Sequence, residues 1–174
     1  VVTNGTCSAA NSSSATMTVV SDPSASQGTA SQTLCQDGTP TDLSLSVSNG
    51  TGSTSYQWYS NTSNSNSGGT VISSNGTSAT YTPVTSANGT KYYYCEVTKS
   101  GNGCDVATSD VASVTVDATS AGGSISGGST VCSGGGGTLT LSGHTGSVTK
   151  WQSDDNSGFS SPSDIVNTST SYSP

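Results

Sequence analysis

Cysteine and histidine are the residues of this chain with the most reactive potential, and both are scarce among its 174 residues. The five cysteines include no C-x-x-C pair, and that spacing is typical of zinc sites. The one histidine, His144, lies in the Gly-rich stretch Ser142–Ser147. A serine nucleophile needs a histidine held against it as a base. We therefore expect no catalytic residue and no metal ligand, so the chain is predicted not to be an enzyme.

Two adjacent carboxylates, Asp154 and Asp155, are followed by the amide of Asn156. Oxygen ligands of this kind suit calcium, but the D-x-D-x-D-G spacing of an EF-hand loop is missing. The matching segment Asn61–Asn64 has no carboxylate. We expect no cofactor, and calcium at Asp154–Asn156 is the alternative.

The charge balance and the distribution of apolar residues each exclude one class of partner. Lys and Arg number 3 against 10 Asp and Glu, arginine is missing, and the formal net charge is −7. Binding to nucleic acid by phosphate neutralisation needs clustered basic side chains. No apolar run approaches the ~18 residues of a membrane span. We therefore expect neither nucleic-acid binding nor direct membrane insertion.

The composition favours strands over helices. Hydrophobic residues make up 29% of the chain, and Thr, Val and seven Tyr are prominent, whereas good helix formers are scarce. Five cysteines in a small acidic chain fit an oxidising compartment. The sequence thus predicts an all-β protein in an extracellular location.

An internal repeat organises these residues. Cys7 precedes Cys104 by 97 positions, and Cys35 precedes Cys132 by the same distance. Met17–Val19 recurs as Val114–Val116 at the same distance, and three further pairs recur at slightly smaller offsets: Leu43–Ser46 with Leu139–Ser142, Trp58 with Trp151, and Tyr81–Pro83 with Tyr172–Pro174. Repeats at a fixed period are the signature of tandem arrays. We expect residues 1–20 to be the C-terminal part of one repeat, 21–117 a complete repeat, and 118–174 the N-terminal part of the next.

A repeat of about 90–97 residues has the size of one immunoglobulin-like (Ig-like) sandwich. The complete repeat contains seven short segments with strand character, separated by Asn-Gly, Ser-Gly or Pro. The order Cys35, Trp58, Cys95, with Tyr93 two residues before Cys95, resembles the Cys–Trp–Cys and tyrosine-corner pattern of Ig domains. The sequence therefore predicts tandem Ig-like β-sandwich repeats.

Alternation along the expected strands separates inward from outward residues. The predicted core consists of Leu43, Leu45, Val47, Trp58, Tyr81, Tyr93 and, in the following repeat, Trp151. Tyr59, Tyr92 and Tyr94 fall on the opposite face. Outward aromatic side chains are candidates for glycan contact, and ordinary cross-strand pairing is the alternative.

The resemblance to Ig domains suggests a disulfide. A Cys35–Cys95 bridge would copy their inter-sheet disulfide, and Cys35–Cys104 and Cys95–Cys104 are the alternatives. Cys7 and Cys132 would then have partners outside the chain.

The amino-acid sequence of the complete repeat also resembles a known family. The segments YQWYSNTSNSNSGGTVISSNGTSATYTP (Tyr56–Pro83) and GTKYYYCEVTKSGNGC (Gly89–Cys104) resemble the Ig-like repeats of giant Bacteroidota surface adhesins. These are the SprB-like gliding-motility adhesins, which the type IX secretion system exports. The resemblance implies a long cell-surface filament that grips polysaccharide or the substratum and carries no catalytic residues in its repeats.

We therefore expect a structural and adhesive segment of an extracellular filament, in which each repeat has its neighbours in the same chain as partners. Two alternatives stay open. The first is a carbohydrate-binding Ig-like module that uses Tyr59, Tyr92 and Tyr94. The second is an accessory domain of a secreted hydrolase.

Overall fold

The computed structural model describes residues 1–2, 4–29, 31–101 and 106–174, and in these ranges the chain forms strands and no helix. The prediction of an all-β protein is thus confirmed. No segment among these residues is a helix of the length and apolarity needed to cross a membrane. The chain divides into two compact units: Val1–Ser31, Thr41–Pro83 and Lys91–Val114 form the first, and Gln32–Pro40, Val84–Thr90 and Thr115–Pro174 form the second.

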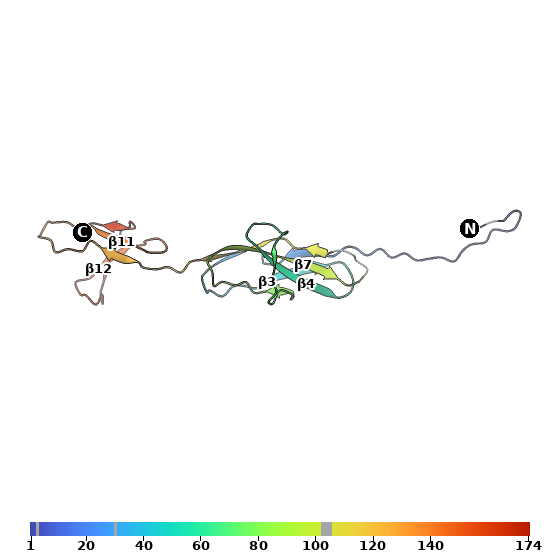
Figure 1. The fold of residues 1–174 in the computed structure, drawn as a ribbon, viewed down its shortest axis with the longest axis horizontal. Coiled ribbons are helices and arrows are strands. Elements are labelled where there is room, and N and C mark those ends of the chain that lie inside the picture. Colours follow the sequence, from blue (N-terminus) through green and yellow to red (C-terminus); the bar gives the residue numbers. More distant parts are fainter. Residues whose placement is uncertain (3, 30, 102–105) are drawn as a thin grey trace. The chain divides into compact units, whose positions relative to one another are not determined.

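Two sheets build the sandwich of the complete repeat (Figure 1). The smaller sheet has the order β1-β3-β6, with β1 at Ser24–Gln27, β3 at Leu43–Ser48 and β6 at Thr80–Tyr81. The larger sheet has the order β2-β9-β7-β4-β5, and β8 also pairs with β7. Its strands are β2 (Ser31–Cys35), β4 (Thr54–Asn61), β5 (Thr70–Val71), β7 (Gly89–Lys99), β8 (Val106–Thr108) and β9 (Ala112–Asp117).

The register between β4 and β7 decides which side chains face the core. Trp58 lies opposite Cys95, and Tyr56 lies opposite Val97. Directly opposite residues share one face of a sheet, and the next pair along faces the other way. The inward positions of these strands carry bulky apolar groups, whereas the outward positions next to them carry Gln57 and Glu96.

The core of the sandwich centres on Trp58, which is completely buried. Its ring centroid lies 5.9 Å from that of Tyr81, so β4 of the larger sheet packs on β6 of the smaller one. Tyr81 in turn lies 5.5 Å from Tyr93. Leu43 is also completely buried, whereas Leu45 and Val47 of the same strand are half-buried. Five more buried residues among those described belong to this core: Cys95, Val97, Ala112, Val114 and Val116.

The C-terminal strands repeat part of this arrangement. One sheet has the order β10-β11-β14, with β10 at Ser124–Ser126, β11 at Leu139–Ser142 and β14 at Ser171–Tyr172. A separate hairpin pairs β12 (Trp151–Ser153) with β13 (Ser163–Ile165). The ring of Trp151 lies 5.8 Å from that of Tyr172 at an interplanar angle of 35°, close to the 5.9 Å and 32° of Trp58 and Tyr81.

The N-terminal segment has little regular structure. Among its described residues, one isolated β-bridge joins Val2 to Ala10. Met17 and Val19 are 88% and 87% exposed. Their sequence counterparts in the complete repeat, Val114 and Val116, lie in the sandwich core and are buried. The same sequence pattern therefore forms a buried strand in one place and an exposed segment in the other.

We predict that Leu43→Ala lowers the free energy of unfolding of the sandwich by roughly 2–5 kcal/mol, because it leaves a cavity beside fully buried neighbours. Urea unfolding followed by the fluorescence of Trp58 measures this, in a Trp151→Phe background that leaves one indole. Val84→Ala is the matched control: Val84 is 62% exposed, and its loss should change stability by less than about 0.5 kcal/mol. Equal effects of the two substitutions would contradict the assignment of Leu43 to the core.

Candidate functional site

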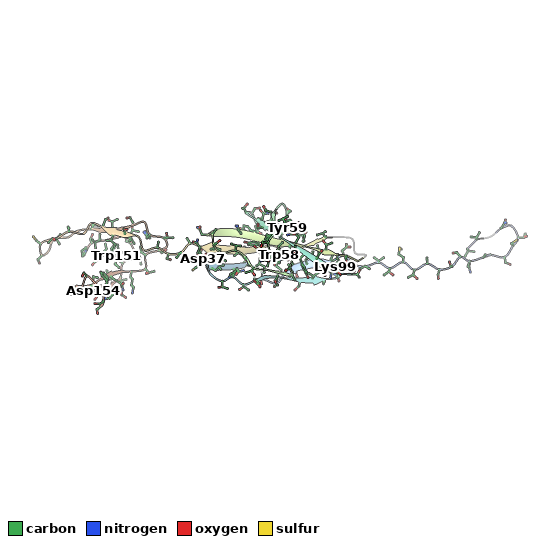
Figure 2. All side chains as sticks on the ribbon, turned by 60° about the horizontal axis from the view of Figure 1, so that its bottom comes forward. Asp37, Trp58, Tyr59, Lys99, Trp151 and Asp154 are labelled. Atoms are coloured by element: carbon green, nitrogen blue, oxygen red, sulfur yellow. The ribbon has the colours of Figure 1, made fainter. Side chains whose placement is uncertain are left out.

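The outer face of the larger sheet carries a pair of stacked tyrosines. Tyr59 on β4 lies opposite Tyr94 on β7, and their rings stack with centroids 4.9 Å apart and an interplanar angle of 3°. The hydroxyl of Tyr59 donates a hydrogen bond of 2.7 Å to Oε2 of Glu96. Figure 2 shows Tyr59 beside Trp58 in the chain. The two side chains belong to opposite faces of β4, so one serves the outer surface and the other the core.

The loop between β4 and β5 folds over this face and covers Tyr94. The backbone N–H of Gly69 donates to the Tyr94 hydroxyl at 3.1 Å, and the side-chain amide of Asn66 donates to the carbonyl of Ser109 at 3.2 Å. A side chain at position 69 would meet the Tyr94 ring, because a Cβ there would lie 2.9 Å from it. Glycine therefore permits the close approach of the loop.

Asn61, the last residue of β4, holds the loop that follows it. Its amide nitrogen donates to the carbonyls of Ser65 and Ser67, and its Oδ1 accepts from the backbone N–H of Ser63. Asparagine favours turns because its short amide can bond to nearby backbone in this way. A polar loop in the sequence thus becomes an ordered cover for the sheet.

This cover corrects the prediction that Tyr94 is exposed. Alternation places Tyr94 on the outer face beside Tyr59, as expected, but the loop leaves it only 2% exposed. Tyr59 and Tyr92 are half-buried. Cross-strand stacking, the alternative reading of these outward aromatics, is what the structure shows for Tyr59 and Tyr94. The three rings do not form an open platform.

The hydrogen bond to Glu96 changes the ionisation of Tyr59. It is the largest of the effects that raise the pKa of Tyr59 from 10.0 to about 12, followed by desolvation and the negative charge of Glu96. A phenol that donates to a carboxylate would have to give up this bond on ionising. Tyr59 therefore stays a hydrogen-bond donor across the neutral range.

The cysteines that the structure describes are free thiols, so it contains no Cys35–Cys95 bridge. Cys35 is exposed at the end of β2, whereas Cys95 is buried opposite Trp58. The physical reason is position: Cys35 ends the strand before the Leu43–Ser48 strand and does not point into the core. Cys104 lies outside the described residues. Cys7 and Cys132 are exposed.

Burial makes the Cys95 thiol unreactive. Desolvation raises its pKa from 9.0 to about 11, with a smaller contribution from the charge of Glu96. The thiolate is the reactive form of cysteine, so a raised pKa and a closed environment both suppress its chemistry. Cys95 fills the core as a small apolar side chain.

Ser109 is a buried polar residue that sequence reasoning missed. It lies between β8 and β9, and its hydroxyl accepts from the backbone N–H of Cys95 at 3.0 Å and donates to the carbonyl of Asp110. Gln27 also donates to it at 3.4 Å. The Ser109 hydroxyl thus provides a partner for the Cys95 amide of β7 at the gap between the end of β8, Thr108, and the start of β9, Ala112. In a chain so rich in serine, no sequence signal distinguishes this one.

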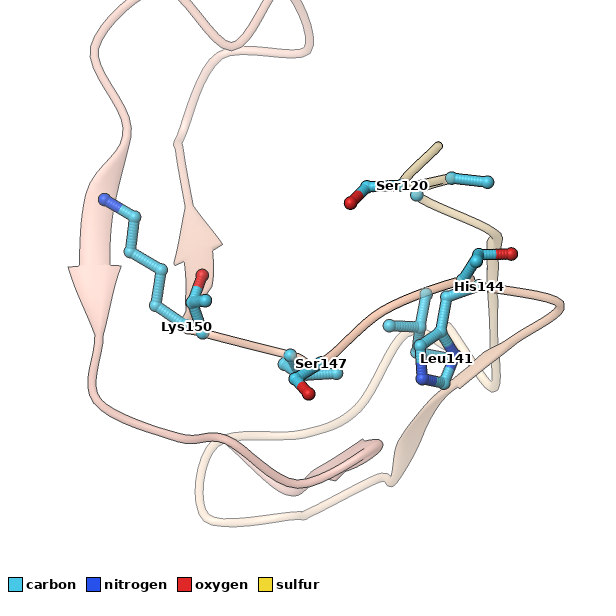
Figure 3. Close-up of a pocket in the computed structure, with 10 residues that line it drawn as sticks. Ser120, Leu141, His144, Ser147 and Lys150 are labelled. Carbon is cyan, nitrogen blue, oxygen red and sulfur yellow. The ribbon is translucent and has the colours of Figure 1, made fainter. Parts of the chain in front are cut away.

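His144 lines a pocket among the C-terminal strands, together with Leu141, Ser147 and Ser120 (Figure 3). Its Nδ1 is buried and has no hydrogen-bond partner. The Lys150 ammonium at the same pocket forms an ion pair of 2.9 Å with Asp164 and lowers the pKa of that carboxyl. His144 Nδ1 is thus not hydrogen-bonded to a nucleophile or a carboxylate. The Lys150 ammonium is already paired with Asp164.

Asp154 builds a loop with its carboxylate. One oxygen accepts from the backbone N–H of Asn156 and the other from that of Ser161, both at 2.8 Å. These bonds hold the pKa of Asp154 below its usual value. Asp154 therefore does for the loop after β12 what Asn61 does after β4. Within the described residues, no group of three or more His, Cys, Asp or Glu is arranged to hold a metal ion.

We predict a strict order of thiol reactivity. In the native reduced chain, an alkylating reagent should modify the exposed Cys7, Cys35 and Cys132 readily and Cys95 at least tenfold more slowly, because Cys95 is buried and its pKa is raised. Peptide mapping by mass spectrometry measures each site. Denatured protein is the control, in which all of these thiols should react alike. Rapid native labelling of Cys95 would refute its placement in the core.

We predict that Glu96→Ala moves the ionisation of one tyrosine from about pH 12 toward pH 10, because Tyr59 loses the bond that raises its pKa. The sign follows from the raised value: the Tyr59–Glu96 contact stabilises the fold fully below pH 10, and its contribution is lost as the pH rises through 12. Absorbance titration of tyrosinate measures the shift. Asp22→Ala, which removes an exposed carboxylate elsewhere, should leave the titration unchanged.

Comparison with known proteins identifies the family of the sandwich. No curated protein matches the chain. A family model described as "Domain of unknown function (DUF8696)" matches residues 24–118, which is more than half of the chain and runs from the first residue of β1 to just beyond β9. The matched segment therefore coincides with the sandwich described above, and the chain belongs to the DUF8696 family.

Proposed function

We propose that this chain is a structural and adhesive segment of an extracellular bacterial surface filament, built from tandem Ig-like sandwiches. One observation carries the proposal, namely that the same tryptophan arrangement occurs twice. The indole N–H of Trp58 donates to the carbonyl of Ser78 at 2.9 Å, and that of Trp151 donates to the carbonyl of Ser169 at 2.9 Å. Each indole also packs on a tyrosine two strands further along the chain, Tyr81 on β6 and Tyr172 on β14. Repetition of one building unit is typical of extended, non-catalytic arrays.

The strand order supports the Ig-like part of the proposal. Variable-type Ig domains have a sheet with two central strands from the C-terminal half of the domain and an edge extension beyond the tryptophan strand. The order β2-β9-β7-β4-β5 fits this plan, with Trp58 on β4. The first strand is divided between the sheets, since β1 pairs with β3 while β2 belongs to the larger sheet.

The surface chemistry supports an adhesive role outside the cell. Only 7% of the residues are charged, and Ser, Thr, Asn and Gly dominate the rest. Side chains of these types bond to hydroxyl-rich surfaces without strong dependence on salt. Individual contacts of this kind are weak, but many linked copies on one filament act together. The resemblance to gliding-motility adhesins points in the same direction.

A carbohydrate-binding module is the second candidate, and one observation favours it. A pocket at the C-terminal end of β4 is lined by Ser60, Asn61, Thr62, Gly68, Gly69, Thr70 and Lys91. Its amide, hydroxyl and ammonium groups suit sugar hydroxyls and carboxylates. Asn61 of this lining lies opposite Tyr92, which is half-buried.

Bead adhesion under flow tests the adhesive role. Beads coated with the full chain should stay on a polysaccharide-coated surface. Doubling the number of chains per bead should more than double the number of beads retained, because binding is multivalent. The Leu43→Ala chain, destabilised in the core, should hold fewer beads. Retention equal to that of bare beads at every coating density would refute an adhesive role.

The variant Lys91→Ala separates the two candidates. A specific sugar pocket should lose at least about tenfold in glycan affinity when its ammonium is removed, which corresponds to 1.4 kcal/mol. Distributed adhesion should change little. Lys150→Ala is the matched control, since it removes a lysine from outside the pocket.

A further inference from the structure

We propose that the C-terminal strands carry a docking surface for a pair of antiparallel β-strands with the side-chain pattern of β7 and β9. The surface, here called the acceptor face, consists of Ile125, Leu141, Val148, Trp151 and Phe159, which line one pocket together with Gly122, Lys150 and Gln152. The inference concerns what these strands bind, and it holds whether or not the filament role is correct.

Two similar sets of strands in this chain differ in how far their core residues are covered. In the sandwich, Leu43 and Trp58 are completely buried, and β7 and β9 supply core side chains around them. Their counterparts Leu139 and Trp151 keep the same neighbours on their own side, as the Trp151–Tyr172 contact shows. Leu139 nevertheless stays half-buried. The C-terminal strands thus have one half of a core.

Large apolar side chains of the acceptor face are exposed. Ile125 is 61% exposed and Phe159 is 54% exposed, although both border the pocket beside the buried Trp151. Large apolar side chains scattered singly on a surface are ordinary, but a group of them around a hollow marks an interaction site. The hollow is largely apolar, which favours an apolar occupant.

The strand β12 has a free edge, which makes another strand the best occupant. In the sandwich, β4 pairs with β5 on one side and with β7 on the other. Its counterpart β12 pairs with β13 alone among the described strands. An unpaired edge presents backbone N–H and C=O groups that a further strand can join. A small apolar ligand would leave these groups unpaired.

The register identifies the chemistry of the occupant. Trp58 lies opposite Cys95, with Tyr93 and Val97 two residues to either side on the inward face. By the repeat, a strand joining β12 should place a small apolar residue opposite Trp151 and larger apolar residues two positions away. A second strand like β9, with Ala112, Val114 and Val116 facing inward, would then close the face.

A fusion tests the proposal directly. Pro174 is the sequence counterpart of Pro83, so a second copy of residues 84–117 added after Pro174 starts at the position that its original has in the sandwich. Hydrogen exchange of the β12 amides is the measurement. We expect these amides to exchange at least about tenfold more slowly in the fusion than in the parent chain, because paired strand amides are protected.

Two variants of the fusion are matched controls. Substitutions C95D and V97D in the added copy alone put charges on its inward face and should abolish the protection. Substitutions E96Q and T98S in the added copy change only outward positions and should preserve it. Protection of the original β7 amides reports in every case that the first sandwich is folded.

Two outcomes would overturn the proposal. One is exchange of the β12 amides in the fusion at the rate of the parent chain while the first sandwich is folded. The other is protection of β12 in the parent chain that rises with protein concentration, since a second copy would then be the occupant.

Discussion

The indole of Trp58 is the contact on which the sandwich depends. Its ring fills the space between the two sheets, while its one polar atom needs a partner once water is excluded. The carbonyl of Ser78 provides that partner, so the segment before β6 is tied to β4 by a bond that is costly to lose. Tyr81 then packs on the ring from the other sheet. One side chain thus fixes the spacing of the sheets and the position of the strand that follows.

Much of this could be predicted from the sequence, because alternation and repetition are properties of the sequence itself. The inward positions of Trp58, Tyr81 and Tyr93 follow from their parity along short strands, and the second tryptophan follows from the repeat. The failures have a common cause. The burial of Tyr94 depends on where a loop of Ser, Asn and Gly folds, and those residues do not reveal the direction of a loop.

The cysteines illustrate the same limit. The order of Cys35, Trp58 and Cys95 suggested a bridge by analogy, but order along a chain does not determine which side chains approach each other. Disulfide geometry requires Cβ atoms about 3.5–4.5 Å apart, whereas one of these thiols is buried in the core and the other faces solvent. Ser109 shows the converse case, in which a common residue has a buried structural role because a strand is interrupted there.

The division of the first strand between the sheets has a mechanical consequence. The chain pairs with β3 over Ser24–Gln27 and then continues as β2, from Ser31, in the sheet that contains β9. Tension applied along the chain at the start of β1 therefore acts on hydrogen bonds in both sheets, so neither sheet can peel away without loading the other. A segment that crosses between the sheets in this way joins them covalently. It adds a resistance to pulling that the small apolar core alone would not provide.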